Sequence, residues 1–300
     1  MARFWPHLLD RSHRKSQIKH SMDSSAQPCR ICNGPTLPSD SRGGIECQAC
    51  GCLMVSEIPS EQELSDYYNS YNASYTGGGR SGGDNQQRYA EKYLELVTRR
   101  HRQGDLIDIG CANNPFPNVA SRCGFRVTAA DYRKPDHLDS AVDFRHGHLG
   151  STSLLMPGDS FDVVTAWAVA EHVTDPMLAF RILAGLMKPG GCVHLTTPEH
   201  GTWITDAALG KTRWFYPPEH LHLLTPRAVA ILAEKNGLRL VEWRHFELNL
   251  PRWLARYGIG LAEALPGWLL ETLSASRWDE MRKSRQSRFT GIAYYRIERA

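Results

Sequence analysis

The chain has 300 residues, of which 41% are hydrophobic and 22% charged, and its formal net charge at pH 7 is +3. This composition is ordinary for a globular protein, and so small a net charge gives no sign of a nucleic-acid partner or a membrane surface. No apolar run is long enough to cross a bilayer, so we expect no transmembrane segment. The basic start of the chain lacks the apolar core of a signal peptide, and we interpret residues 1–27 as a flexible leader.

Five of the eight cysteines lie in one short N-terminal stretch, four of them in two Cys-x-x-Cys pairs. Paired thiolates at this separation are typical ligands of a tetrahedral zinc ion. We therefore expect Cys29, Cys32, Cys47 and Cys50 to hold a structural Zn²⁺ within residues 28–56, a segment too short to bury a core of its own. Without a secretion signal, cysteines used in this way indicate the reducing cytoplasm.

Residues 57–104 are predicted to form a helical, tyrosine-rich extension. Ser60 and Glu63 have the spacing of a capping box at the start of a short helix, and the residues around Tyr67 are rich in tyrosine. A second helix is expected at about 85–102. The tyrosines fit two roles, a cover over an active site or an edge packed against the core.

An apolar strand that begins at Asp105 reaches an acidic residue, Asp108, near its end, followed by Gly110 and a tight polar turn. Open α/β sheets bind nucleotides at such strand–turn–helix units, because a glycine lets the backbone approach the ligand and a helix N-terminus favours an anionic group. Asp131, at the end of the next predicted strand, lies 21 residues after Gly110. That spacing is typical of a carboxylate that binds both ribose hydroxyls, although a turn without a ligand has the same local pattern.

Further apolar runs alternate with helical stretches, and this alternation favours a parallel sheet covered on both faces. We expect an α/β protein with a Rossmann-like, mostly parallel, seven-stranded sheet and helices on both faces, plus a small N-terminal zinc ribbon. Helices are predicted at 177–187 and 225–236. The predicted strands cover residues 105–109, 125–131, 141–144, 161–167, 192–198, 238–243 and 291–299.

Three stretches together resemble the class I S-adenosylmethionine-dependent methyltransferases: residues 108–111, 161–164 with 171–173 and 175–176, and 186–191. Residues 214–226 look like the subgroup related to ubiquinone-biosynthesis O-methyltransferases. The paired cysteines are similar to those of zinc-containing methyltransferases, which include C-methyltransferases of nucleotide-linked deoxysugars. The resemblance covers about residues 85–245 and the last strand, and it implies a methyltransferase domain over residues 105–300 with a helical insertion at about 250–284.

The resemblance also implies a binding site for S-adenosylmethionine. Asp108 and Gly110 would face the methionine end of this cofactor, and Asp131 would bind its ribose. The sequence departs from the family where Ala112 and Asn114 replace glycines. The complete set of implied cofactor-binding residues is Asp108, Gly110, Ala112, Asn114, Asp131, His148, Ala166 and Trp167, in which His148 replaces a frequent adenine-binding Asp and the last two line the methyl path.

Methyl transfer from a sulfonium is an in-line displacement, so the protein mainly aligns the acceptor and excludes water. A hydroxyl or carbon acceptor also needs a general base, and histidine has a suitable pKa for this role. The resemblance favours His220 as the base, with Glu219 orienting or polarising a neighbour. His172 is the second candidate, with packing at the entry of a helix as its alternative role.

We therefore predict a methyltransferase that acts on a small-molecule acceptor, at a hydroxyl or carbon of a sugar, a quinone-like compound or another natural product. Two alternatives stay open at this stage: an RNA methyltransferase, against which the few basic residues of the cysteine segment speak, and an inactive methyltransferase-like zinc-ribbon interaction protein. The apolar residues 251–274 are interpreted as a lid or homodimer contact, or else as a peripheral contact for a lipid-linked acceptor.

Overall fold

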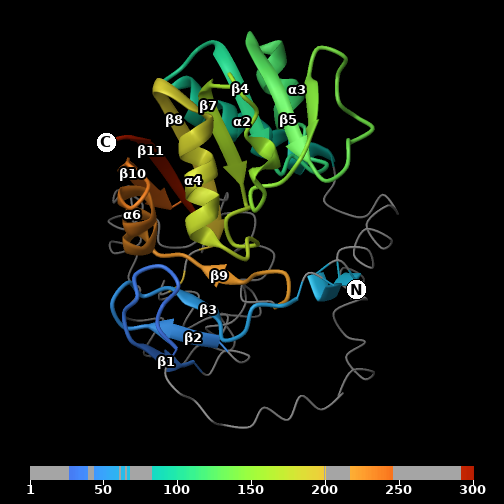
Figure 1. The fold of residues 1–300 in the computed structure, drawn as a ribbon. Coiled ribbons are helices and arrows are strands. Elements are labelled where there is room, and N and C mark those ends of the chain that lie inside the picture. Colours follow the sequence, from blue (N-terminus) through green and yellow to red (C-terminus); the bar gives the residue numbers. More distant parts are fainter. Residues whose placement is uncertain are drawn as a thin grey trace, which may run out of the picture.

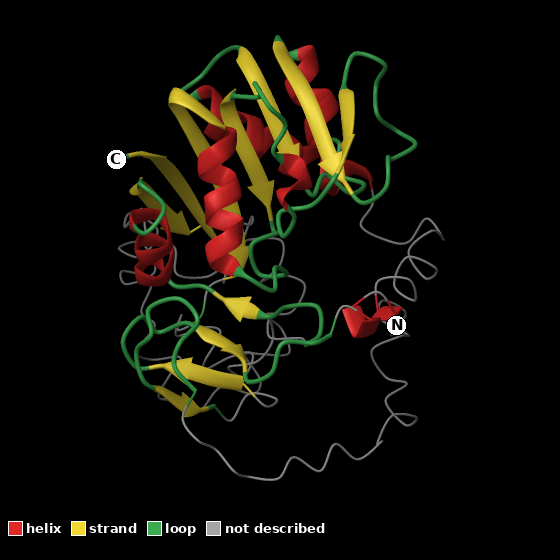
Figure 2. Ribbon diagram, in the orientation of Figure 1, coloured by secondary structure: helices red, strands yellow, loops and turns green. Residues whose placement is uncertain are grey.

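The computed structural model describes residues 27–39, 44–60, 62–64, 66–67, 83–198, 200, 217–245 and 292–300. Within them, two sheets lie one above the other in Figure 1 and Figure 2, a large one flanked by helices and a small one at the N-terminal cysteine segment. Nearly all of the predicted leader and the whole apolar stretch 251–274 lie outside the described residues. No helix among the described residues has the length and apolar character needed to span a bilayer.

The large sheet has seven strands in the order β10-β11-β8-β7-β4-β5-β6. Its neighbours from β6 through β8 are parallel, and β11 runs antiparallel to both β8 and β10. The chain order therefore reverses at β4, with β5 on one side and β7 on the other. The strands are β4 (Gly104–Ile109), β5 (Phe125–Asp131), β6 (Asp143–His146), β7 (Phe161–Trp167), β8 (Met187–Pro198), β10 (Leu238–His245) and β11 (Ile292–Arg299).

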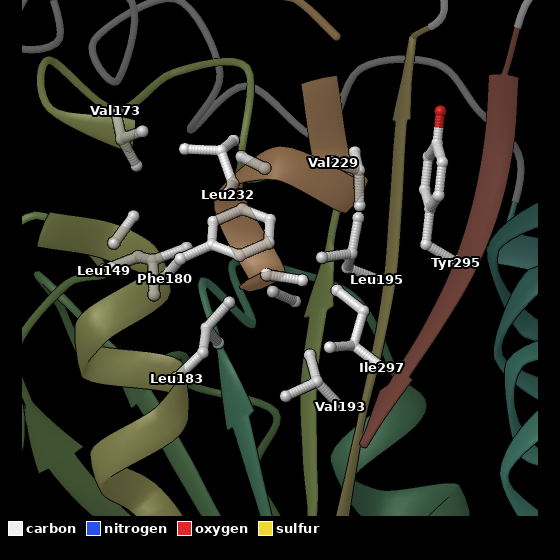
Figure 3. Close-up of a cluster of buried hydrophobic side chains, with 14 of the residues drawn as sticks. Leu149, Val173, Phe180, Leu183, Val193, Leu195, Val229, Leu232, Tyr295 and Ile297 are labelled. Atoms are coloured by element: carbon white, nitrogen blue, oxygen red, sulfur yellow. The ribbon is translucent and has the colours of Figure 1, made fainter. Parts of the chain in front are cut away.

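Among the described residues, four α-helices cover this sheet from both faces: α2 (Gly83–Thr98), α3 (Phe116–Arg122), α4 (Pro176–Leu186) and α6 (Pro226–Glu234). Residues of α2 and α3 pack in one apolar cluster, and residues of α4 and α6 pack in another. The two clusters arise because side chains alternate along each strand, so that neighbouring strand residues face opposite sides. Figure 3 shows the second cluster, in which Phe180 of α4 lies among residues of α6, β8 and β11. The predicted fold class is confirmed.

The predicted strand at 192–198 is longer than expected. The sequence Lys188-Pro189-Gly190-Gly191 ends the helix, as predicted, but the backbone continues directly as the extended strand β8 from Met187. A Cβ on Gly191 would lie 2.9 Å from the carbonyl oxygen of Phe161, so the glycine allows β8 to run close beside β7. The short third strand is shifted two residues toward the C-terminus, from the predicted 141–144 to Asp143–His146.

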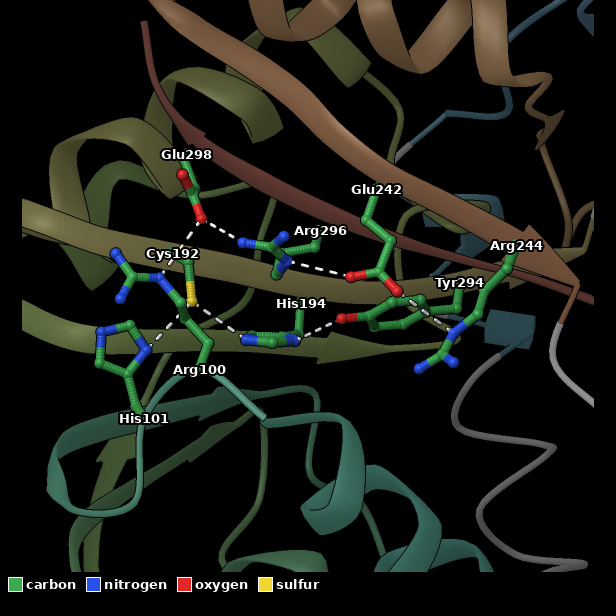
Figure 4. Close-up of polar contacts among 9 residues, drawn as sticks. All are labelled: Arg100, His101, Cys192, His194, Glu242, Arg244, Tyr294, Arg296 and Glu298. Atoms are coloured by element: carbon green, nitrogen blue, oxygen red, sulfur yellow. Dashed lines mark hydrogen bonds and ion pairs between the residues drawn. The ribbon is translucent and has the colours of Figure 1, made fainter. Parts of the chain in front are cut away.

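A polar network joins β8, β10 and β11 at the end of the sheet (Figure 4). His194 of β8 is fully buried, with Nδ1 2.8 Å from the Tyr294 hydroxyl and Nε2 3.0 Å from the Cys192 sulfur. Arg296 pairs with Glu242 of the neighbouring strand β10 and with Glu298 two residues further along its own strand β11. Burial lowers the pKa of His194 to about 3, so its imidazole is neutral and its role is structural.

The small sheet has the order β1-β2-β3-β9, and its last strand comes from the opposite half of the chain. Leu53 pairs with Leu223 and Met54 with His222, so β9 extends the sheet of the cysteine segment. The strands are β1 (Thr36–Pro38), β2 (Gly44–Cys47), β3 (Leu53–Val55) and β9 (His222–Leu223). Sequence periodicity gave no signal for β9, because a two-residue strand has no detectable pattern.

Candidate active site and cysteine cluster

The four cysteines of the two Cys-x-x-Cys pairs converge on one point. Their sulfur atoms all lie within 4.8 Å of one another, with Cys29 3.7 Å from Cys50 and Cys32 3.4 Å from Cys47. Thiolates arranged tetrahedrally at about 2.3 Å from a zinc ion are separated by similar distances. The fifth cysteine of the segment, Cys52, lies outside this group.

Backbone N–H groups point at these sulfur atoms, as the turns around a thiolate site require. Ile31 donates to the Cys29 sulfur and Gly34 to the Cys32 sulfur, both at 3.4 Å, and Ala49 donates to the Cys47 sulfur at 3.3 Å. Such donors orient thiolate ligands and stabilise their charge. A Cβ on Gly34 would lie 2.6 Å from the Cβ of Ala49, so a glycine is needed between the two turns. The donor set and its surroundings fit a Zn²⁺ ion.

At the carboxyl end of β4, the turn before α3 is tied to the end of β5. The Ala112 N–H donates to Asp131 Oδ2 at 2.8 Å, and the Tyr132 N–H donates to Asp131 Oδ1 at 2.6 Å. Gly110 has a φ of +73°, and a Cβ there would lie 2.6 Å from Val169 Cγ2. The left-handed backbone at this position therefore favours a glycine. The hydrogen bonds place the carboxylate of Asp131, at the end of β5, beside the turn after β4, where the chain order of the sheet reverses.

Ala112 adopts a left-handed conformation without being a glycine, at φ 42°. Its N–H bond to Asp131 holds this conformation, and Asn114 Oδ1 accepts from the Phe116 N–H at 2.9 Å at the entry of α3. The two residues that replace the family's glycines are therefore built into the turn rather than disrupting it.

Asp108 is buried and only partly paired. Its Oδ1 accepts a 2.6 Å hydrogen bond from the Thr165 hydroxyl, whereas Oδ2 has no partner among the described residues. Burial, with a smaller contribution from nearby Asp131, raises the pKa of Asp108 to about 7. A buried carboxyl with one unpartnered oxygen, two residues before Gly110, is suited to a polar or cationic ligand group.

Two aromatic pairs flank this edge of the sheet. The exposed ring of Tyr132 stacks on His148, with centroids 4.5 Å apart, and burial lowers the pKa of this histidine, which keeps it neutral. On β7, Trp167 stacks on Tyr93 of α2 at 4.1 Å. Ala166, the neighbour of Trp167, packs in the other apolar cluster, so these two predicted residues face opposite sides of the sheet.

The three predicted catalytic residues come together although they lie on two separate loops. The Nδ1–H of His172 donates to the carbonyl oxygen of Glu219 at 2.8 Å, and the rings of His172 and His220 meet edge to face with centroids 4.8 Å apart. The Tyr67 hydroxyl donates to Glu219 Oε2 at 2.8 Å. Tyr67 therefore brings the tyrosine-rich extension to this cluster.

Glu171 is a member of the cluster that the sequence analysis missed. It is 1% exposed, its Oε1 lies 3.8 Å from His172 Nε2, and its Oε2 has no partner among the described residues. Glu171, His172 and His220 each offer a ligand atom within 4.8 Å of the others, so the trio could hold a metal ion. The sequence feature that could have identified Glu171 is its position directly before His172, in the loop after a predicted strand.

Burial makes both Glu171 and His172 neutral near pH 7. It raises the pKa of Glu171 to about 8 and, together with His220, lowers the pKa of His172 to about 4. Because a carbonyl only accepts, the Glu219 carbonyl fixes the proton of His172 on Nδ1 and leaves a lone pair on Nε2. With so low a pKa, His172 is a weak base, and its bond to Glu219 gives it an orienting role in the cluster.

Comparison with known proteins agrees with this architecture. Residues 82–243, more than half of the chain, match the model of a methyltransferase domain family. The chain belongs to this methyltransferase family.

Two curated relatives illustrate the extent of the similarity. The ubiquinone biosynthesis O-methyltransferase of Ruegeria pomeroyi is 29% identical over 175 residues, which are 53% of this chain and 70% of that protein. The enzyme of the same name from Xanthomonas campestris pv. campestris is 35% identical over 101 residues, which are 31% of this chain and only 42% of that protein.

Among solved structures, the magnesium protoporphyrin IX methyltransferase of Synechocystis PCC 6803, with bound SAH, matches 80% of this chain and 100% of its own. The TM-score is 0.50 at 13% sequence identity, so this similarity concerns the fold. The predicted resemblance to class I methyltransferases is confirmed at that level.

The raised pKa of Glu171 predicts a pH-dependent stability. Between its ordinary pKa of 4.5 and about 8, the folded protein keeps a proton that the unfolded chain has lost, so this group's contribution to stability falls as pH rises. The slope is at most about 1.4 kcal/mol per pH unit. We expect Glu171→Gln to gain stability relative to wild type from about pH 5 to pH 8, measured by urea unfolding.

Glu95→Gln, at an exposed position of α2, is the matched control and should track the wild type at every pH. A constant difference between Glu171→Gln and wild type across this range would contradict a raised pKa.

Proposed function

We propose that this protein transfers a methyl group from S-adenosylmethionine to a hydroxyl or carbon of a small-molecule acceptor. The observation that carries the proposal is the pairing of Asp131 with the turn that contains Gly110, on the sheet edge from which the loop bearing Glu171 and His172 also leaves. Family membership supports it, and the names of the curated relatives, which concern ubiquinone biosynthesis, favour a small acceptor.

On the cofactor side, the proposed contacts follow from the groups present. Asp131 offers carboxylate oxygens to the two ribose hydroxyls, and the Gly110 turn allows close approach of the backbone. The unpartnered oxygen of Asp108 would accept from the methionine end. The stacked Tyr132 and His148 offer flat surfaces and a ring edge for an adenine.

When bound, the cofactor supplies a methyl group that is already activated on a sulfonium. The protein then has to align the acceptor and take its proton. We assign proton removal to His220, with the acceptor proton passing to its imidazole. His172 packs against His220 and holds the Glu219 backbone, and Tyr67 holds the Glu219 carboxylate.

We further propose that the four converging cysteines bind a structural Zn²⁺. Closed sites with four thiolate ligands leave no open position for a substrate, so their contribution is to folding. None of the eight cysteines forms a disulfide, which supports the reducing cytoplasm as the protein's location.

We expect purified protein to contain about one zinc ion per chain, because four sulfur atoms form one site. Cys47→Ser should lower zinc content severalfold, whereas Cys123→Ser, an exposed thiol outside the cluster, should leave it unchanged. Elemental analysis, together with thiol titration, measures the zinc content of both variants. Full zinc content in Cys47→Ser would refute the assignment.

Calorimetric titration with S-adenosylhomocysteine tests the cofactor site. Asp131→Asn should weaken binding about 10- to 100-fold, since hydrogen bonds to a charged group contribute about 1.5–3 kcal/mol. Asp143→Ala, exposed at the amino end of β6, should bind like wild type. If the wild-type protein fails to bind at millimolar ligand, it is not a methyltransferase in activity.

The base is tested with a labelled methyl donor and a panel of phenolic and sugar acceptors. His220→Asn should lower kcat about 10²- to 10⁴-fold, the usual contribution of a general base, without changing S-adenosylhomocysteine affinity. His101→Asn, just before β4 at the opposite edge of the sheet, is the control. A loss confined to KM would make His220 a binding residue instead.

A further inference from the structure

Helix α6 is anchored at both ends to the turns that carry the cysteines. At its first end, the Thr225 hydroxyl donates to the carbonyl oxygen of Cys50 at 2.5 Å. Just after its last residue, the Lys235 ammonium donates to the carbonyl oxygen of Ile31 at 2.7 Å. Cys50 and Ile31 belong to the two different Cys-x-x-Cys turns, so the helix spans the whole metal-binding unit.

The segment immediately before α6 is also fixed to the cysteine segment. The Val55 N–H donates to the Leu221 carbonyl at 3.0 Å, where β9 joins β3. β3 itself begins three residues after Cys50. Figure 1 shows β9 at the edge of the small sheet that faces the large sheet.

The opposite side of the same segment is bound by the loop after β7. The N–H groups of Leu221 and His222 both donate to the Glu171 carbonyl, at 2.7 and 3.2 Å, and His172 holds the Glu219 carbonyl. Residues 219–222, which include His220, are therefore clamped between the cysteine segment and the loop that carries Glu171.

Apolar packing makes this connection continuous. Fully buried Ile31 and Met54 of the cysteine segment lie in the same cluster as Val229 and Leu232 of α6. The cofactor edge, which is the carboxyl end of β4 and β5, has other supports than the cysteine segment. Asp131 accepts hydrogen bonds from the N–H groups of Ala112 and Tyr132, which belong to the large sheet and its turns. The two halves of the proposed active site thus depend on different supports.

We propose that the cysteine segment positions the acceptor half of the active site, and that Thr225 is the positioning residue that connects the metal-binding turn to the segment carrying His220, residues 219–222. The inference rests on the proposed function in taking residues 219–220 as the acceptor side. With the metal site intact, β3 holds β9 against Glu171. Loss of the metal releases β9 and leaves the cofactor edge in place.

Hydrogen exchange measured by mass spectrometry on the full-length, zinc-loaded protein tests this without an acceptor. Zinc removal by a chelator should speed exchange of peptides covering 53–55 and 221–223 together, about tenfold or more, while S-adenosylhomocysteine affinity changes less than about twofold. Unchanged exchange at 221–223 while 53–55 opens would overturn the proposal. So would loss of ligand affinity in parallel, because the metal would then support the whole fold.

Variants at Thr225 separate this link from helix capping. Its Oγ also accepts from the Ala228 N–H and so caps α6, at 3.1 Å. Thr225→Asp keeps a capping oxygen but cannot donate to the Cys50 carbonyl. With zinc bound, we expect it to speed hydrogen exchange at 221–223 about fivefold, and we expect the same of Thr225→Val, which loses both bonds. Thr225→Ser keeps both bonds and should restore wild-type exchange. Wild-type behaviour of Thr225→Asp would show that capping alone matters.

Thr98→Val is the matched control, since the Thr98 hydroxyl donates to a carbonyl of its own helix. The proposed function and the proposed role of the cysteine segment can be contradicted independently of each other. Absence of S-adenosylhomocysteine binding would remove the methyltransferase activity but leave the exchange result valid, and an exchange result against coupling would leave cofactor binding unaffected.

Discussion

A buried backbone must satisfy its N–H and carbonyl groups, and the segment from Glu219 to His222 does so by bonding in two directions. Its N–H groups bond to the Glu171 carbonyl, and its own carbonyls accept from His172 and Val55. Leaving such groups unpaired away from water would cost several kcal/mol in total. This constraint joins the small sheet to the large one and fixes where His220 lies.

The cofactor edge obeys a different constraint, which is steric. Gly110 takes a left-handed conformation in front of Val169, and the turn that follows is tied to Asp131. The chain order of the sheet reverses at β4, and open α/β sheets bind ligands outside the carboxyl ends of their strands at such a point. Burial also acts on the carboxyl groups: it raises the pKa of Asp108 to about 7 and that of Glu171 to about 8, so neither is fully ionised near pH 7.

Much of the fold was predictable because its signals are local. Apolar runs ending in Asp108, Asp131 and Trp167 gave the central strands, and the Cys-x-x-Cys spacing gave the sulfur cluster. Errors occurred where packing outweighed local preference, as at Gly191, where a sequence that ends helices continues directly as a strand beside Phe161. The candidate catalytic residues were chosen by resemblance, and only their loop positions could be read from the pattern.

The sequence by itself determined most strands and helices of the large sheet, the four cysteines that converge and the turn at Gly110, because spacing along the chain fixes those features. Only the tertiary structure decided that Glu171 and Tyr67 join His172 and Glu219, and that β9 completes the sheet of the cysteine segment. Contacts between the cysteine segment and the second half of the chain link residues up to 204 positions apart, as in the bond from Lys235 to Ile31. They depend on how two sheets pack together, and no local pattern of side chains encodes that arrangement.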